Sequence, residues 1–166
     1  MSTSASAPLS IRAATITDVA AIHDLIRQLA VYEKLEQLVS GTPDMLRESL
    51  FGARPSCECV IAEVADCAVG FALYFTTYST FLAKPGLYLE DLFVIPSSRG
   101  RGYGKALIVH LAAIAQAREY GRFEWRVLDW NTPSIEFYKS LGASVMPEWH
   151  LVRMTAAEIR ALVARG

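Results

Sequence analysis

The chain has 166 residues, of which 52% are apolar and 20% are charged, and its formal net charge is −1. This length and composition are typical of one globular domain with its own hydrophobic core, and they exclude a disordered, highly charged chain. The near-neutral charge also argues against a nucleic-acid-binding protein, which usually carries a strongly basic surface.

The sequence has no sign of export or of membrane insertion. A membrane helix needs about 18–20 consecutive apolar residues, and no apolar run in the sequence is that long. The opening MSTSASAPLS lacks the basic and apolar regions of a secretion signal, so we expect residues 1–8 to be a disordered tail before one domain over 9–166. The three cysteines (Cys57, Cys59 and Cys67) fit neither a disulfide framework nor a zinc site. We expect reduced, mostly buried thiols in a cytoplasmic protein.

Apolar periodicity and capping residues predict a mixed α/β domain in the order β-α-α-β-β-β-α-β-α-β-α. Lys84-Pro85-Gly86 is interpreted as a turn between two strands. Strands are expected over 9–14, 57–64, 69–78, 87–95, 123–128 and 143–154, and helices over 18–35, from Pro43 to about Leu50, over 103–120, from Thr132-Pro133 to Leu141, and from Thr155 onward.

The most informative segment is YLEDLFVIPSSRGRGYGKALI, residues 88–108, which reads as a buried strand, a glycine-rich loop and a helix. Glycines at alternate positions let backbone N–H groups approach a ligand, and the helix N-terminus adds the positive end of its dipole. Arg99, Arg101 and Lys105 add cations, so the loop suits a pyrophosphate. It is neither a Rossmann nor a P-loop fingerprint, because Lys105, Arg99 and Ala106 stand where those motifs require Gly, Gly and Ser or Thr.

The pattern R-x-x-G-x-G after an apolar strand resembles the acetyl-CoA loop of the GCN5-related N-acetyltransferase (GNAT) superfamily. The segments LYLEDLFV, RGRGYG, WNTPSIEFYKSLGA and IRAATITDVAAIHDLIRQLAVYEKLE resemble the diamine (spermidine/spermine) N-acetyltransferase branch of that superfamily. The resemblance implies a single-domain GNAT fold, whose central mixed, mostly antiparallel sheet is splayed between the strands near 88–95 and 123–128 and is flanked by helices. It also implies acetyl-CoA as cosubstrate and a homodimer.

The resemblance carries site roles as well. It implies that the pantetheine arm of acetyl-CoA pairs with backbone at Phe93, Val94 and Ile95, and that Tyr138 is the tyrosine near the thioester sulfur. Tyr32 and Glu33, at the end of the first helix, match the family's substrate segment. The remaining cofactor contacts that it implies are Arg99, Gly100, Arg101, Gly102, Tyr103, Gly104, Lys105, Asn131 and Ser134.

The acids Glu90 and Asp91 interrupt an otherwise apolar strand. Neighbouring strand residues point to opposite faces, and a buried acid without a function is costly, so we expect Glu90 to be functional and Asp91 structural. An amine acceptor has a pKa near ~10.4 and must lose a proton before it attacks, and Glu90 is the candidate base, directly or through water. Tyr138 can protonate the departing thiolate; by spacing alone it would be a core residue.

The sequence therefore predicts an acetyl-CoA-dependent N-acetyltransferase that acts by direct attack on a small cationic amine: a polyamine, a diamine or a lysine-like amino acid. Two alternatives stay open, a protein or peptide N-acetyltransferase and a CoA-binding module without catalysis. The three histidines are isolated, so no metal site is expected. The acceptor pocket is the part least like the family, because residues 34–40 are not a close match.

Overall fold

The computed structural model describes residues 7–166 and divides the chain into two units, Met1–Arg126 and Val127–Gly166. Most of the expected N-terminal tail, residues 1–6, lies outside the described residues. In the part that is described, no helix has the length and apolar character needed to cross a bilayer.

The first unit contains a five-stranded sheet in the order β1-β2-β3-β4-β5. The pairings from β1 to β4 are antiparallel, and β5 runs parallel to β4. A mixed, mostly antiparallel sheet with flanking helices confirms the expected fold class. The strands are β1 (Leu9–Ala13), β2 (Glu58–Val64), β3 (Cys67–Ser79), β4 (Lys84–Val94) and β5 (Phe123–Trp125).

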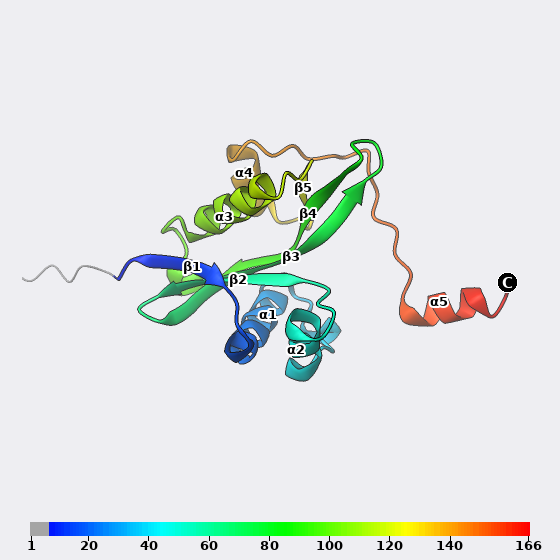
Figure 1. Ribbon diagram of the computed structural model, residues 1–166, viewed down its shortest axis with the longest axis horizontal. Coiled ribbons are helices and arrows are strands. Elements are labelled where there is room, and N and C mark those ends of the chain that lie inside the picture. The colour runs from blue at the N-terminus through cyan, green and yellow to red at the C-terminus, as the bar shows by residue number, and fades with distance from the viewer. Residues whose placement is uncertain (1–6) are drawn as a thin grey trace, which may run out of the picture. The chain divides into compact units, whose positions relative to one another are not determined.

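Helices cover both faces of this sheet (Figure 1). α1 (Val19–Glu33) and α2 (Pro43–Phe51) lie on one face, and α3 (Tyr103–Ala117) lies on the other. The face under α1 carries the core cluster, because apolar residues at helical spacing meet the alternate residues of the strands. Its buried members are Ile22, Leu25, Leu29, Leu50, Cys59, Ile61, Phe71, Leu73 and Phe93.

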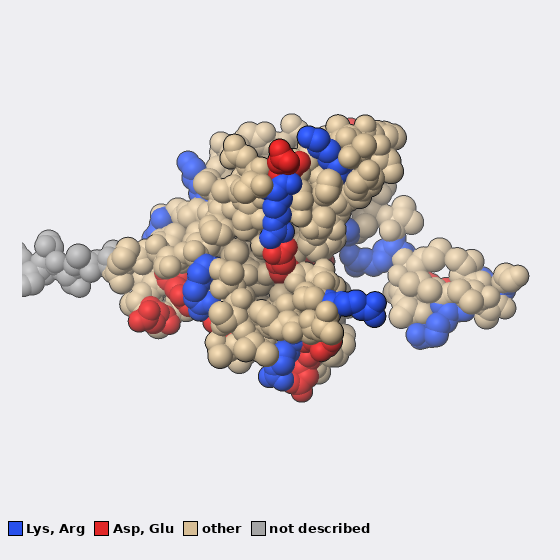
Figure 2. Space-filling view, viewed as in Figure 1, with Lys and Arg blue, Asp and Glu red and all other residues tan. Residues whose placement is uncertain are grey.

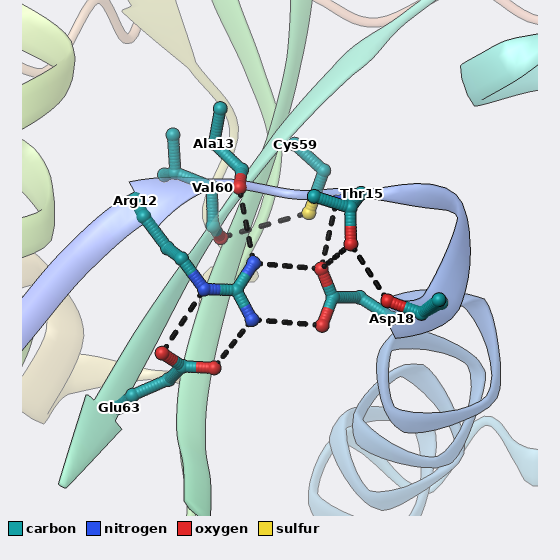
Figure 3. A network of polar contacts seen from close by, with 8 residues as sticks. Arg12, Ala13, Thr15, Asp18, Cys59, Val60 and Glu63 are labelled. Atoms are coloured by element: carbon teal, nitrogen blue, oxygen red, sulfur yellow. Dashed lines mark hydrogen bonds and ion pairs between the residues drawn. The ribbon is translucent and has the colours of Figure 1, made fainter. Parts of the chain in front are cut away.

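A polar network fixes the start of α1 against the sheet edge (Figure 3). The Arg12 guanidinium donates to both carboxylate oxygens of Asp18, at 2.7 and 2.9 Å, and its Nε donates to Glu63 at 3.0 Å. The backbone N–H of Thr15 also donates to Asp18, at 2.7 Å. Arg12 holds the pKa of the Asp18 carboxyl well below its usual range. The network therefore ties β1, β2 and the first turn before α1 to one another.

Several expected boundaries differ from the structure. The turn expected at Lys84-Pro85-Gly86 is wrong: the hairpin turn lies at residues 80–83 and Lys84 already begins β4, where Pro85 is opposite Tyr78. β5 has three residues rather than six, and α3 ends at Ala117 rather than at Tyr120. Of the cysteines, Cys59 is buried, Cys57 is half-buried and Cys67 is exposed, so burial of most of them was also a wrong expectation.

The second unit contains α4 (Thr132–Ser140) and α5 (Ala156–Val163). Thr155 and Glu158 form a capping box at the start of α5, where the sequence predicts a helix from Thr155 onward, and Gly142 has a φ of 92° just after α4. The strand expected over 143–154 is wrong, because that segment has no regular secondary structure. No residue of 127–166 forms a strand.

Candidate functional site

The two strands β4 and β5 separate after a short common stretch. They pair at three positions, ending with Leu89 opposite Trp125, whereas β4 continues to Val94. The next backbone N–H, that of Ile95, donates to Val69 of β3 at 3.0 Å. Because amide directions alternate along a strand, the amide of Val94 faces the other edge, where no strand of residues 7–126 pairs with it. This open edge can accept an extended ligand as an added strand does.

A β-bulge lies where the strands begin to separate. In the pairing with β3, Leu73 is opposite Asp91 and the next residue, Tyr74, is opposite Leu89, so Glu90 has no partner. The extra residue interrupts the strict alternation of side chains along β4. As a result Leu89 and Asp91 lie on different faces of the sheet, although they are two residues apart.

The glycine-rich loop follows β4 directly and leads into α3. Gly100 and Gly102 have φ values of 74° and 81°, which favour glycine, and a Cβ built at either would meet no atom within 4 Å. Gly102 is the N-cap of α3, so the free N–H groups of the first helical turn begin at this open space. The exposed side chains of Arg101 and Lys105 lie in the same segment. This set of donors and cations fits a pyrophosphate group.

Arg99, the first residue of the loop motif, contacts three parts of the first unit. Its Nε donates to the carbonyl oxygen of Val94 at 2.9 Å. Its guanidinium carbon lies 4.6 Å from the ring centroid of Tyr32 on α1 and 5.3 Å from that of Phe93 on β4. These are cation–π distances. Arg99 thus connects the end of α1, the end of β4 and the glycine-rich loop.

Three acids meet near the end of α1. Glu33 is the last residue of α1, and burial raises the pKa of its carboxyl. Burial also raises the pKa of Asp91 to about 6, and the charges of Glu90 and Glu33 add to this rise. The site therefore contains a carboxyl group that changes its charge close to neutral pH.

The distribution of burial between the two adjacent acids is the reverse of the expectation. Glu90 is exposed and Asp91 is half-buried, so Glu90 is not the buried acid of the pair. The bulge explains the difference, because the expectation assumed unbroken alternation along β4. Sequence reasoning also missed Asp91 as a titrating group. The only local signal was the acid pair itself, since the bulge is visible only in the pairing with β3.

The second unit contains the remaining predicted residues on and before α4. Asn131 is the N-cap of α4, is buried, and accepts a hydrogen bond from the Ser134 N–H at 3.4 Å. The Tyr138 ring lies 5.2 Å from that of Phe137 and is half-buried. Asn131 and Ser134 are thus brought together at one helix end, and the roles of all three residues stay predictions.

The described residues show neither a metal site nor a patch of one charge in this view. Among residues 7–166, no group of three or more His, Cys, Asp or Glu side chains is placed to hold a metal ion. Figure 2 shows Lys and Arg interspersed with Asp and Glu on the described part of the face that it draws.

Comparison with known proteins identifies the family. Residues 21–143 match the acetyltransferase (GNAT) family model. A thialysine N-epsilon-acetyltransferase of Sus scrofa is 36% identical over 96% of this chain and 99% of its own length. An L-ornithine N5-acetyltransferase of Arabidopsis thaliana is 34% identical over 92% of this chain and 86% of its own. A solved structure, an integron cassette protein of V. cholerae, superposes with a TM-score of 0.79 at 26% identity, over 93% of this chain and 97% of that chain. The chain therefore belongs to the acetyltransferase (GNAT) family.

Proposed function

We propose that this protein transfers an acetyl group from acetyl-CoA to a primary amine of a small cationic acceptor. One observation carries the proposal: the pairing of β4 with β5 ends at Leu89, and the open edge of β4 leads directly into the glycine-rich loop. In that loop Gly100 and Gly102 have positive φ values and open space beside them. An edge with free amides followed by a helix N-terminus accepts an extended amide chain that ends in a pyrophosphate. Pantetheine with its diphosphate has that form.

Within this proposal the pantetheine arm lies along the segment Phe93, Val94 and Ile95, and the Val94 N–H is its backbone donor, because the Ile95 N–H already donates to Val69. The pyrophosphate lies on the loop from Arg99 to Gly104, with Tyr103 and Lys105 at the start of α3. Asn131 and Ser134, at the start of α4, are further cofactor contacts. The cosubstrate supplies an activated thioester, so the reaction needs no covalent acyl-enzyme.

The amine acceptor is bound near the acids at the end of α1. Glu33 and Tyr32 contact the cationic acceptor, and Glu90 takes the proton of its ammonium group, directly or through water. The amine nitrogen then attacks the thioester carbonyl, and a backbone N–H of β4 donates to the oxyanion. The C–S bond breaks as Tyr138 gives its proton to the sulfur, and the nitrogen gives its second proton, directly or through water, to the Tyr138 oxygen to leave the neutral amide. The exposure of Glu90 supports this role, because a base must be reached by its substrate.

The relatives support a small-molecule amine as the acceptor, since their names specify thialysine and L-ornithine. Both are amino acids with a side-chain amine, which favours a lysine-like acceptor among the three classes considered. A homodimer and a cytoplasmic location are part of the same proposal. The two alternative functions are acetylation of a protein or peptide and CoA binding without catalysis.

The test is release of free CoA thiol from acetyl-CoA in the presence of spermidine, putrescine, aminoethylcysteine, a neutral arylamine and a lysine peptide. We expect turnover with the small cationic amines and little with the arylamine or the peptide. Glu90→Gln should lower kcat/KM for the cationic amines and steepen its rise with pH, while acetyl-CoA affinity stays the same. Turnover of the peptide alone would support the protein acetyltransferase instead, and no turnover with any amine would overturn the catalytic function.

A further inference from the structure

Arg126 is placed beside the point where β4 and β5 separate. It is the first residue after β5, directly after the last pair, Leu89 and Trp125. Its guanidinium carbon lies 5.4 Å from the centroid of the Tyr88 ring. The Arg126 side chain is exposed, so a ligand at the fork can reach it.

Arg126 lies on the same face of the sheet as the acids. Tyr88 is opposite Phe75 in the sheet, and their rings are 5.0 Å apart. Phe75 is two residues from the core residue Leu73 on β3, which places its side chain on the face covered by α1. Asp91 is opposite Leu73 and therefore belongs to that face too. One face of the forked strands thus carries a carboxyl group and a guanidinium.

The charge of Arg126 is not neutralised by an ion pair within its own unit. No carboxylate of residues 7–126 lies within ion-pair distance of it, whereas Arg122, at the other end of β5, pairs with Glu124 at 2.7 Å. Three charged groups act on the Tyr88 hydroxyl: Arg126 lowers its pKa, whereas Glu90 and Glu124 raise it, within a net rise caused mainly by burial. Arg126 and the two carboxylates are therefore close to one hydroxyl group, and Glu124 is the carboxylate that pairs with Arg122.

We propose that Arg126 binds the carboxylate of the acceptor, and that the preferred acceptor is a basic amino acid rather than a diamine or polyamine. A guanidinium presents parallel N–H donors that match a carboxylate. The acids attract the ammonium group that reacts, while Arg126 would repel a second ammonium at the other end of a diamine. This inference rests on the proposed amine acetylation and adds a residue that determines specificity.

The experiment compares acceptors that differ only in the carboxylate: L-lysine with cadaverine, and L-ornithine with putrescine. At saturating acetyl-CoA, we expect kcat/KM to be about 10- to 100-fold higher for each amino acid than for its diamine. This is the change in affinity that one hydrogen-bonded pair between charged groups typically produces. Arg126→Gln should remove most of this ratio, mainly by raising KM for the amino acids. Arg126→Glu should reverse the preference, and Arg126→Lys should retain part of it.

Arg122→Gln is the matched control, because it removes the same charge from the other end of β5, where Glu124 already pairs with it. Its amino-acid to diamine ratio should equal that of the wild type. A wild-type ratio near one, a preference for the diamines, or an unchanged ratio in Arg126→Gln would overturn the role of Arg126 while acetylation itself stands. Failure of all four amines to release CoA would overturn the proposed function and this inference with it.

Discussion

The guanidinium of Arg99 stacks on the ring of Tyr32, with 4.6 Å between its central carbon and the ring centroid. The first residue belongs to the loop proposed to bind pyrophosphate, and the second to the α1 segment proposed to bind the acceptor. The same guanidinium is held by the Val94 carbonyl through Nε. A contact of this kind couples the two halves of the site, because the orientation of the loop arginine depends on a ring from the acceptor side.

Removing the Tyr32 ring should therefore weaken acetyl-CoA binding as well as acceptor binding. A cation–π contact contributes about 0.5–2 kcal/mol, so Tyr32→Ala should raise the Kd for acetyl-CoA about 2- to 30-fold. Tyr32→Phe keeps the ring and should bind acetyl-CoA as the wild type does. Titration calorimetry without acceptor measures both. An unchanged Kd in Tyr32→Ala would show that the stacking does not orient Arg99 for the cosubstrate.

A side chain at Gly102 should block the cosubstrate site. Gly102→Val places a branched side chain in the open space above the start of α3 and also forces a non-glycine residue to a φ of 81°. Gly142→Val is the matched control, because Gly142 has a φ of 92° and equally open surroundings outside the loop. Both variants should lose stability, by about 1–2 kcal/mol. Only Gly102→Val should lose acetyl-CoA affinity, by tenfold or more, in the same calorimetric titration. Equal affinities in the two variants would contradict the assignment of the loop.

The loop and the helix behind it could be predicted because their signals are local. Alternating glycines, the neighbouring cations and the apolar spacing of Leu107 and Leu111 all lie within one short segment. The same is true of α4, for which Thr132-Pro133 predicts the start and Gly142 lies just after the end, and of the capping box of α5. The N-cap of α4 is Asn131 rather than Thr132. Caps and periodicity depend on residues close in sequence, and a single sequence contains them in full.

The fork and the bulge depend on pairing between strands that are distant in the sequence. Nothing within FEWRVL shows that pairing with β4 stops at Trp125, and nothing within YLEDLF shows that Glu90 is left without a partner. The raised pKa of Asp91 depends on the burial of its side chain beside that bulge and on the charges of Glu90 and of Glu33, which lies on a separate helix. Residues 143–154 show the converse case, since their pattern favours a strand but the segment has no regular secondary structure. A local pattern does not by itself supply the paired backbone groups that a strand needs.

Removing the Tyr138 hydroxyl should slow the reaction without weakening cosubstrate binding. Tyr138→Phe keeps the ring that lies 5.2 Å from Phe137 and removes only the proton donor. General acid catalysis contributes about 10²- to 10⁴-fold, so kcat should fall by a factor in that range if departure of the thiolate limits the rate. Tyr78→Phe, which removes an exposed hydroxyl from the β3–β4 hairpin, serves as the control. A wild-type kcat for Tyr138→Phe would mean that water or another group protonates the sulfur.

Asp91 should make both stability and acceptor binding depend on pH. Its pKa in the folded protein is about 6, above the ordinary 3.8, so the folded state holds this proton more tightly than the unfolded state. Stability from this group is therefore full at low pH and is lost as the pH rises from about 4 to about 6. Asp91→Asn removes the cost of the buried charge and should raise the free energy of unfolding near pH 7.5 by about 1–3 kcal/mol. The gap between the two proteins should shrink toward pH 4.

The same charge should favour the acceptor, because an ionised Asp91 attracts an ammonium group. For a cationic amine, KM of the wild type should fall as the pH rises from 5 to 7, and Asp91→Asn should flatten that fall while leaving the Kd for acetyl-CoA unchanged. Urea unfolding at several pH values and initial rates over the same range measure the two effects. A stability gap that stays constant down to pH 4 would contradict the raised pKa. A KM profile that Asp91→Asn leaves unchanged would place the acceptor's cation away from Asp91, and the residual dependence would then belong to Glu33, whose pKa burial also raises.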